Sequence, residues 1–246
     1  MQARCISELS ERQVHIWTFS TSAENDVVAK CERVLTSDET GRAAQFRFSG
    51  DRESFILTRG VLRHLLGCYL GLHPGSIQFE YSSNGKAALA SDSGLQFNVA
   101  HSRQMAAIAV TAGCDVGIDL EQMRTLPDLG QIAARFFCTE EAAEIDSLPE
   151  GERARAFFTC WTRKEAYIKA TAEGLFRPLN SFRVMKQPGE PGNLVLQDHE
   201  ATVSESWTLH DLHIVPDYAA AIAYRDRPRP LSIFPAIDLA QLIDIS

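Results

Sequence analysis

The sequence predicts an α+β fold made of two similar units within one chain of 246 residues. Strand-like and helical segments follow one another along most of its length, and three pairs of segments resemble each other at similar separations. The pairs are residues 14–19 and 116–121, 52–57 and 164–169, and 106–110 and 220–224. Each unit therefore opens with a strand, contains a long helix and closes with a strand of small residues.

The repeats put the boundary between the units near residues 111–115. We expect an N-terminal α+β unit over residues 1–112 and a C-terminal α+β unit over 113–235. The Arg-Pro-Arg-Pro run at 227–230 ends the regular pattern, so residues 236–246 are expected to form a peripheral tail. A ligand site between the units is the default expectation. The duplication also predicts a monomer, since one chain supplies both halves of the cleft.

The first unit opens with residues 14–19, which are mostly β-branched and aromatic and favour a strand. Thr36 and Glu39 have the spacing of a capping box, which predicts the start of a helix. A longer helix is predicted over residues 51–70, where apolar residues recur at near-helical spacing until a glycine and a proline follow. The strands expected to complete the unit lie at 77–81, 95–99 and 105–110.

The second unit opens with residues 116–121, in which apolar and other residues alternate as in a strand with one buried face. Helices are expected over 129–137, from 139 onward and over 153–174, where a glycine and then a proline stop the pattern. The strands expected after these helices lie at 181–185, 194–196, 207–215 and 218–224, the last two forming a hairpin.

Composition and charge exclude several classes of protein. Hydrophobic residues are 45% of the chain and charged residues 23%, as in globular proteins and unlike disordered ones. The net charge of −8 disfavours a nucleic-acid coat, because no excess of Lys and Arg is present to neutralise phosphates. We expect no contact with membranes, since no apolar run is long enough to span one and the N-terminus lacks a signal-peptide pattern.

Six cysteines are scattered along the chain without a C-x-x-C pair. This spacing fits free thiols in a reducing compartment better than a disulfide framework or a zinc site. It predicts a cytoplasmic protein.

Two carboxylates share one face of the predicted strand at 116–121. Residues two apart in a strand project from the same side, so Asp119 and Glu121 point together, and Gly117 leaves open space beside them. Burying two carboxylates unpaired is costly, and a divalent cation would remove that cost. The alternative is an edge strand whose acidic face lies in water.

A third acid comes from the predicted helix at 153–174. Glu165 and Lys169 lie four residues apart, on the flank of a stripe of aromatic and aliphatic side chains. The simpler interpretation is a surface pair that stabilises the helix by only ~0.3–0.5 kcal/mol. With Asp119 and Glu121, however, Glu165 would supply three hard oxygen ligands, a set that suits Mg²⁺ completed by water and substrate phosphates.

Basic side chains near these acids are candidates for holding phosphate. Lys169 lies one helical turn beyond Glu165 and could meet a phosphate oxygen as a point charge. His101 follows a predicted strand of the first unit and is a second candidate. Taken alone, His101 is more often a structural histidine, and Lys86, in a glycine turn, is more often simply solvated.

The segments 117–121 (Gly-Ile-Asp-Leu-Glu) and 161–169 (Trp-Thr-Arg-Lys-Glu-Ala-Tyr-Ile-Lys) resemble the two signature motifs of 4′-phosphopantetheinyl transferases. Their order and spacing match the surfactin-synthetase-activating (Sfp) type, not the short holo-acyl-carrier-protein synthase type. Residues 98–102 (Asn-Val-Ala-His-Ser) resemble the family's N-x-S-H-S motif, and residues 84–87 its G-K-P turn. The resemblance covers about residues 36–179 and implies a pseudo-duplicated, two-subdomain phosphopantetheinyl transferase fold.

The chain departs from the family pattern at two positions. Ala100 replaces the usual serine and Ala87 the usual proline, at positions that the family uses to line the adenine pocket. Glu39 lies where some members have a basic residue for the 3′-phosphate, which leaves Arg42 as the better match.

The resemblance implies an enzyme that transfers the 4′-phosphopantetheine arm of coenzyme A to a serine of an acyl or peptidyl carrier protein, with release of adenosine 3′,5′-bisphosphate. By the same resemblance, Mg²⁺ is held by Asp119, Glu121 and Glu165. The catalytic residues are Glu165 and Lys169. The base for the serine is either Glu165 or a metal-bound water next to it, and the sequence does not choose between them.

The coenzyme A site implied by the resemblance includes residues from both units. They are Arg42, Gly85, Lys86, Ala100, His101 and Lys169. Two other classes of function remain open: a metal-dependent phosphodiesterase or nuclease, which the acidic balance disfavours, and a non-catalytic duplicated binding module.

The segment 124–137 is a candidate surface for the carrier protein. It follows the acidic strand directly and combines Leu126, Leu129 and Ile132 with Arg124 and Arg135. An acidic enzyme cannot attract an acidic carrier over long range, so apolar contact and a few local basic residues would have to supply the affinity. The alternative is that these leucines pack the helix into its own unit.

Overall fold

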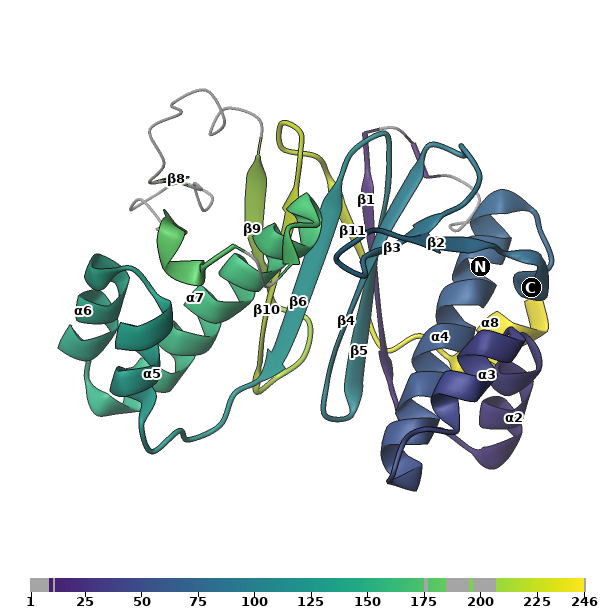
Figure 1. Ribbon diagram of the computed structural model, residues 1–246, viewed down its shortest axis with the longest axis horizontal. Helices are drawn as coiled ribbons and strands as arrows, with labels where there is room; N and C mark the ends of the chain where they lie inside the picture. The colour runs from purple at the N-terminus through teal and green to yellow at the C-terminus, as the bar shows by residue number, and fades with distance from the viewer. Residues whose placement is uncertain (1–8, 11, 175–176, 185–194, 197–206, 246) are drawn as a thin grey trace.

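The computed structural model describes residues 9–10, 12–174, 177–184, 195–196 and 207–245. Two β-sheets lie side by side in the middle of the molecule, and each is covered on its outer side by helices (Figure 1). Apolar side chains of both sheets, among them Ile16, Ile118 and Ile222, form a core between the sheets. The α+β class predicted from the sequence is confirmed. We call the elements packed on the first sheet the first unit, and those packed on the second sheet the second unit.

The first sheet has the strand order β11-β1-β5-β4. β1 and β5 are antiparallel, as are β5 and β4, whereas β11 runs parallel to β1. A separate hairpin of β2 and β3 precedes β4 in the chain. The strands are β1 (Val14–Ser20), β2 (Phe79–Tyr81), β3 (Ala87–Leu89), β4 (Leu95–Ser102), β5 (Met105–Ala112) and β11 (Leu231–Phe234).

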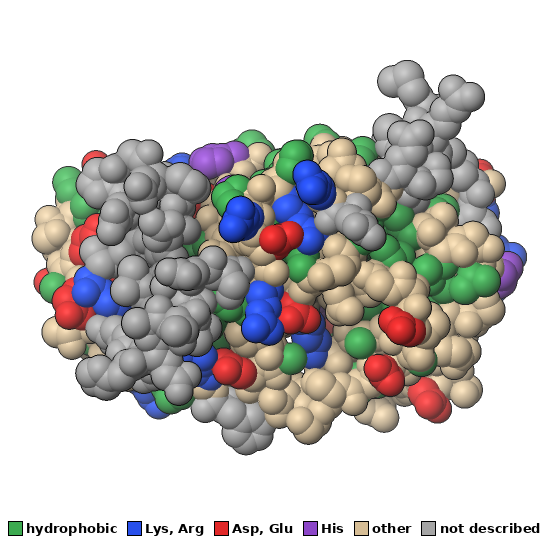
Figure 2. Space-filling model, turned by 90° about the horizontal axis from the view of Figure 1, so that it is seen from above, with side chains coloured by type: hydrophobic (Ala, Val, Ile, Leu, Met, Phe, Trp, Pro, Cys, Tyr) green, Lys and Arg blue, Asp and Glu red, His purple; other side chains and the backbone are tan. Residues whose placement is uncertain are grey.

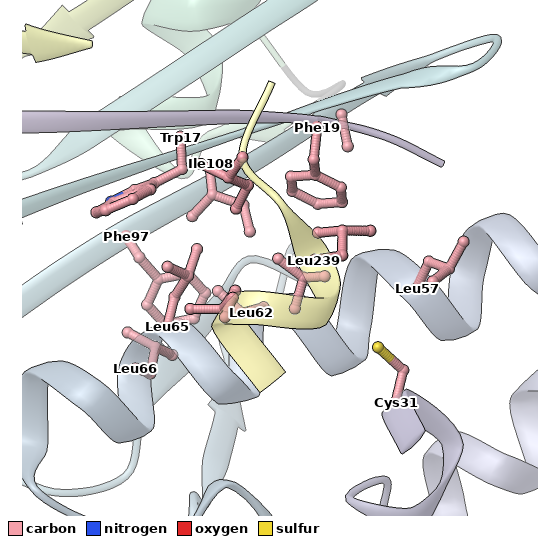
Figure 3. Close-up of a cluster of buried hydrophobic side chains, with 14 of the residues drawn as sticks. Trp17, Phe19, Cys31, Leu57, Leu62, Leu65, Leu66, Phe97, Ile108 and Leu239 are labelled. Atoms are coloured by element: carbon pink, nitrogen blue, oxygen red, sulfur yellow. The ribbon is translucent and has the colours of Figure 1, made fainter. Parts of the chain in front are cut away.

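The helices of the first unit are α2 (Asn25–Arg33), α3 (Ser37–Ala43), α4 (Ser49–Leu70), the short 3₁₀ helix η1 (Pro74–Ser76) and α8 (Leu239–Ile245). The predicted capping box is present, since Thr36 accepts from the Glu39 amide and Glu39 accepts from the Thr36 amide. Side chains of α4 meet those of β1, β4 and β5 in an apolar core (Figure 3).

The expected peripheral tail is wrong. Residues 231–234 form β11, which adds to the first sheet beside β1, and α8 then packs into the first unit. Leu239 and Leu242 are buried, and Figure 3 shows Leu239 beside residues of α4 and the sheet. The Arg-Pro-Arg-Pro run interrupts regular structure without ending the packed body, because the apolar residues after it still have a core to enter.

The second sheet has the order β6-β10-β9, with both pairs antiparallel. The long helix α7 packs against β6 and β10. The strands are β6 (Val116–Gln122), β9 (Thr208–Leu212) and β10 (Tyr218–Tyr224), with a small pair of β7 (Phe182–Arg183) and β8 (Val195–Leu196). The helices are α5 (Leu129–Phe136), α6 (Thr139–Ser147), α7 (Glu150–Thr171) and the 3₁₀ helix η3 (Leu179–Ser181). Parts of the strands expected at 181–185 and 194–196 lie outside the described residues.

Each unit contains a buried ion pair at the same place in its fold. In the first unit, Arg63 contacts Glu39 at 2.8 Å and donates to the carbonyls of Pro74 and Ile77. In the second unit, an equivalent set joins three elements through one ammonium. Its members are the Lys164 ammonium, the Glu141 carboxylate at 2.7 Å, and the carbonyls of Leu179 and Phe182.

Arg63 is therefore the counterpart of Lys164, and the expected match of residues 52–57 with 164–169 is wrong in register. The counterpart lies eleven residues further along the helix than Arg52. Eleven residues are close to three turns of an α-helix, so both matches present the same apolar face to the sheet. Hydrophobic spacing alone could not distinguish them.

No disulfide joins the cysteines of the described residues, and most of these cysteines are buried. None of the helices within the described residues combines the length and apolar character needed to cross a bilayer.

Candidate active site

A pocket of about 400 Å³ lies where the two units meet. Its first-unit wall comes from α4, the turn between β2 and β3, and β4, and its second-unit wall from the end of α7. A cavity therefore lies where the ligand site was expected. The residues that line it are Arg42, Phe55, Thr58, Arg59, Leu62, Asn84, Gly85, Lys86, Ala87, Phe97, Asn98, Val99, His101, Glu165, Ile168, Lys169, Ala172 and Gly174.

The acidic face of β6 is turned toward α7, and Gly117 lets the helix approach. A Cβ at Gly117 would lie 2.1 Å from the Ala166 carbonyl oxygen and 2.4 Å from the Ala170 nitrogen. The open space expected beside Gly117 is therefore wrong, because the helix backbone fills it. This close contact brings the helix that carries Glu165 and Lys169 against the strand that carries Asp119.

Side chains of β4 join the first sheet to β6. The Ile118 amide donates to Asn98 Oδ1 at 2.9 Å, and the Gln122 amide donates to Ser102 Oγ at 3.2 Å. Ser102 Oγ in turn donates to Glu121 Oε2 at 2.8 Å. The sequence pointed to His101 in this segment and missed Asn98 and Ser102, although their positions within the resembling motif were a usable signal.

Asp119 and Lys169 form the central ion pair of the site. Lys169 Nζ lies 2.7 Å from Asp119 Oδ1 and 3.3 Å from the Ile118 carbonyl oxygen. The second oxygen, Asp119 Oδ2, is buried and has no hydrogen-bond partner among the described residues. The lysine therefore neutralises one side of the carboxylate, and the other side keeps an unsatisfied acceptor.

The two glutamates near this pair are electrostatically coupled to it. Burial raises the pKa of Glu121, and the nearby Asp119 raises it further, against the hydrogen bond from Ser102 and the charge of Lys169. Burial also raises the pKa of Glu165, with added repulsion from Asp119 and Glu121. Both glutamates thus resist ionising beside Asp119, and a further positive charge would favour their ionised forms.

The donor atoms of the site suit a hard divalent cation, since they belong to Asp119, Glu121 and Glu165. They supply carboxylate oxygens, they repel one another, and Asp119 Oδ2 lacks a partner. The side chains do not form the expected three-ligand cluster, and no such group of His, Cys, Asp or Glu occurs elsewhere in the described part of the chain. The reason is local, since Lys169 and Ser102 occupy one oxygen each of Asp119 and Glu121.

The predicted phosphate-binding residues lie around the pocket in both units. Arg42 lines it from the first unit, with its guanidinium over the Phe55 ring, and His101 and Lys169 line it near the acids. Desolvation of the His101 ring and the charge of Lys169 lower the pKa of His101, while Asp119 opposes this shift. Thr58, which the sequence analysis missed, faces the same pocket with a buried hydroxyl that has no hydrogen-bond partner.

The remaining predicted coenzyme A residues divide into two groups. Gly85, Lys86 and Ala87 line the pocket, but the Lys86 ammonium is bound to the carbonyl oxygens of Val116 and Ala170. Ala100 does not line it within the described residues; its side chain is buried in the core between the sheets. Its methyl group therefore faces away from the cavity that the resemblance led us to expect it to line.

Among the residues that the structure describes, the first unit has no equivalent acidic site. The match of residues 14–19 with 116–121 puts Trp17 at the place of Asp119. Like β6, β1 pairs antiparallel with a strand of small residues. His64 follows Arg63 as Glu165 follows Lys164. Trp17 is buried and stacks on Phe234 at 3.9 Å between ring centroids. Aromatic packing in the first unit thus replaces the charges of the second.

Comparisons with known proteins agree with this arrangement. A family model described as the 4′-phosphopantetheinyl transferase superfamily matches residues 115–223, and one for the N-terminal part of 4′-phosphopantetheinyl transferase matches residues 17–113. The 4′-phosphopantetheinyl transferase HetI of Nostoc sp. is 38% identical over 208 residues, which cover 83% of this chain and 84% of HetI. The chain belongs to the 4′-phosphopantetheinyl transferase superfamily.

Other members of the superfamily are similar over most of the chain. The 4′-phosphopantetheinyl transferase psf-1 of Bacillus pumilus is 32% identical over 192 residues, covering 78% of this chain and 79% of psf-1. Sfp of Bacillus subtilis is 24% identical over 202 residues, covering 81% of this chain and 87% of Sfp. These matches confirm the family and the Sfp type that the signature segments predicted.

Proposed function

We propose that this superfamily member transfers the 4′-phosphopantetheine arm of coenzyme A to a serine hydroxyl of an apo-carrier protein and releases adenosine 3′,5′-bisphosphate. The observation that carries the proposal is the pocket between the units. Two side chains of the first unit that can donate to phosphate, Arg42 and His101, face the same cavity as Glu165 and Lys169 of the second. A long ligand with phosphates at both its nucleotide end and its centre fits such a distribution of charge.

The residues of the pocket divide the binding of coenzyme A between the two units. Arg42 would bind the 3′-phosphate at the nucleotide end, since it lies on the first-unit wall with Phe55 and Thr58. His101 and Lys169 would bind the pyrophosphate, because they lie beside the acids. Positioning and charge neutralisation provide most of the rate enhancement in such a transfer.

Mg²⁺ is the cation that we propose for Asp119, Glu121 and Glu165, and when bound it would neutralise the pyrophosphate and the charge that develops on it. Ser102 holds the Glu121 carboxylate in place, since its hydroxyl donates to Glu121 Oε2 at 2.8 Å. Gly117 supports the proposed site by allowing α7 to carry Glu165 close to β6. The metal dependence is a proposal drawn from the donor set.

In the proposed reaction, the serine oxygen attacks the β-phosphorus of coenzyme A and the bond from that phosphorus to the bridging oxygen breaks. The bridging oxygen leaves with the α-phosphate as adenosine 3′,5′-bisphosphate. The serine proton passes to Glu165 or to a water molecule held near it. The raised pKa of Glu165 makes its carboxylate a better proton acceptor near neutral pH.

The rival classes identified from the sequence are less well supported. A nuclease would present a basic surface to the phosphate backbone. On the described part of the face in Figure 2, however, Lys and Arg side chains are interspersed with Asp and Glu. A binding module without activity would not require one buried and two half-buried acids that repel one another next to a cavity.

Mass spectrometry of an apo-carrier protein incubated with coenzyme A and Mg²⁺ tests the proposal. A mass gain of one phosphopantetheine on the carrier is the expected result. Hydrolysis of coenzyme A without transfer would support a phosphodiesterase. No reaction with acyl or peptidyl carriers, in the presence of Mg²⁺, would support the binding module. We further propose a monomer acting in the cytoplasm, from the duplicated cleft and the free thiols.

A further inference from the structure

The C-terminal end of α7 is capped by side chains from the other unit. A helix leaves its last carbonyl groups without partners inside the helix. Here Lys86 Nζ donates to the Ala170 carbonyl at 2.9 Å. Asn84 Nδ2 donates to the carbonyls of Ala172 and Glu173, at 2.8 and 3.2 Å. Both donors belong to the turn between β2 and β3 of the first unit.

Lys86 also binds the strand that carries the acids. Its ammonium donates to the Val116 carbonyl at 3.1 Å, at the first residue of β6. One cation thus joins the start of the strand with Asp119 to the end of the helix with Glu165 and Lys169. A positive charge at a helix C-terminus is favourable, because the carbonyl groups there carry partial negative charge.

The turn that presents these two side chains is closed by its own hydrogen bonds. The Ser82 amide donates to the Lys86 carbonyl at 2.9 Å, and the Lys86 amide donates to Ser82 Oγ at 3.1 Å. Gly85 has φ of 81°, a conformation that glycine adopts without strain. The end of α7 fits closely against it, since a Cβ at Gly174 would lie 3.3 Å from Asn84 Cβ. The donors are therefore held in place before any ligand arrives.

We propose that Asn84 and Lys86 are positioning residues for the transfer reaction. They hold the last turn of α7 against the first unit, and thereby keep Lys169 and Glu165 aligned with Asp119 and with the first-unit side of the pocket. Lys86 acts on the helix, and its charge does not bind the nucleotide. The kinetic part of this inference rests on the proposed function, whereas its structural part does not.

Kinetics with two substrates separate a positioning lysine from a phosphate-binding one. The variants are Lys86→Met and Asn84→Ala, with Ser83→Ala as a control in the same turn and Arg42→Met as a control for phosphate binding. Each is assayed with coenzyme A and with 3′-dephospho-coenzyme A. We expect kcat of the first two variants to fall by about tenfold or more with both substrates. Their preference for coenzyme A over the dephospho form stays within about twofold of wild type, and Arg42→Met loses that preference.

A Lys86→Met variant that lost the preference as Arg42→Met does would overturn the inference, since its charge would then bind the 3′-phosphate. Unchanged kcat in both Lys86→Met and Asn84→Ala would also overturn it. The Asn84 side chain is on the surface, so Asn84→Ala provides the test even if Lys86→Met does not fold.

Hydrogen exchange of the ligand-free protein tests the inference without any activity. We expect the amides of residues 168–173 to exchange about tenfold faster in Asn84→Ala and Lys86→Met than in wild type, whereas those of 155–162 keep wild-type protection. Equal protection at 168–173 in wild type and both variants would reject the cap. If wild type transfers nothing to any carrier, the proposed function fails, and the exchange result still decides whether the cap exists.

Discussion

Lys169 donates a hydrogen bond of 2.7 Å to Asp119 Oδ1, so the cation of the second signature segment neutralises an acid of the first. The Asp119 side chain is 7% exposed and the Lys169 side chain 30% exposed. Asp119 is therefore shielded from solvent, whereas Lys169 is accessible from the pocket. This asymmetry lets Lys169 meet a phosphate while Asp119 stays buried.

Asp119→Ala is expected to abolish transfer and weaken Mg²⁺ binding without unfolding the protein. It removes the buried oxygen that lacks a partner, and it also releases Lys169. Titration calorimetry with Mg²⁺ and the mass-spectrometric transfer assay measure the two effects, with the exposed Asp92→Ala as a control. Near wild-type transfer by Asp119→Ala would show that the metal assignment is wrong.

Lys169→Ala is expected to raise KM for coenzyme A and lower kcat. One charge-assisted contact is worth roughly 1.5–3 kcal/mol, which corresponds to about 10–150-fold in kcat/KM. Steady-state kinetics measure the change. Lys30→Ala is the matched control, because Lys30 also pairs with an aspartate at 2.8 Å, but that aspartate is exposed and neither residue is among those that line the pocket. If both lysine variants behaved like wild type, Lys169 would have no role in binding phosphate.

Gly117→Ala is expected to lower both stability and activity. The added methyl group would overlap the backbone of α7 at Ala166 and Ala170, and neither backbone atom can rotate away. The resulting separation of α7 from β6 would weaken core packing and lower the free energy of unfolding by roughly 1–3 kcal/mol. For a protein of this size, that corresponds to a few degrees in Tm. Calorimetry measures Tm. Gly151→Ala, where nothing lies within 4 Å of the new Cβ, is the control and should leave Tm nearly unchanged.

His64 is expected to make stability depend on pH. Burial lowers its pKa from 6.5 to about 4, with a smaller contribution from His73. Between these values the unfolded chain binds a proton that the folded protein does not, so stability falls as pH falls from 6.5 toward 4. The total loss is about 3 kcal/mol.

Urea unfolding of wild type and His64→Leu between pH 7 and 4.5 tests this expectation. The difference in free energy of unfolding between the two proteins should shrink by about 2 kcal/mol or more over that range. The exposed His213→Leu is the control and should follow wild type at every pH. Parallel plots of the free energy of unfolding against pH for wild type and His64→Leu would show that the pKa of His64 is the same in the folded and unfolded states.

Phe136 gives a better test of the proposed carrier surface than Leu129. Leu126, Leu129 and Ile132 pack partly against the core of the second unit, whereas Phe136 at the end of α5 is 36% exposed and contacts Trp161. We expect Phe136→Ala to raise KM for the carrier severalfold with KM for coenzyme A unchanged. Leu129→Ala should instead lower Tm. An unchanged carrier KM in Phe136→Ala would place docking on another surface.

Local patterns in the sequence determined the elements and the chemistry of the site. Period-two alternation located the strand with Asp119 and Glu121, and the Thr36–Glu39 spacing located a helix start that has both expected hydrogen bonds. These features depend on residues two to four apart, whose relative placement follows from backbone geometry alone. The expectation of a hard metal ion likewise follows from residue type, because the three candidate ligands are all carboxylates.

Only the tertiary structure decided which distant residues meet. It showed that Lys86 caps a helix of the other unit, that Ser102 holds Glu121, and that the C-terminal strand returns to lie beside β1. It also decided the register of the repeat, in which Arg63 is the counterpart of Lys164. The sequence could not decide this, because a shift of eleven residues leaves the same helical face toward the sheet. Such contacts depend on how packed faces fit together, and spacing along the chain carries no information about a partner eighty or two hundred residues away.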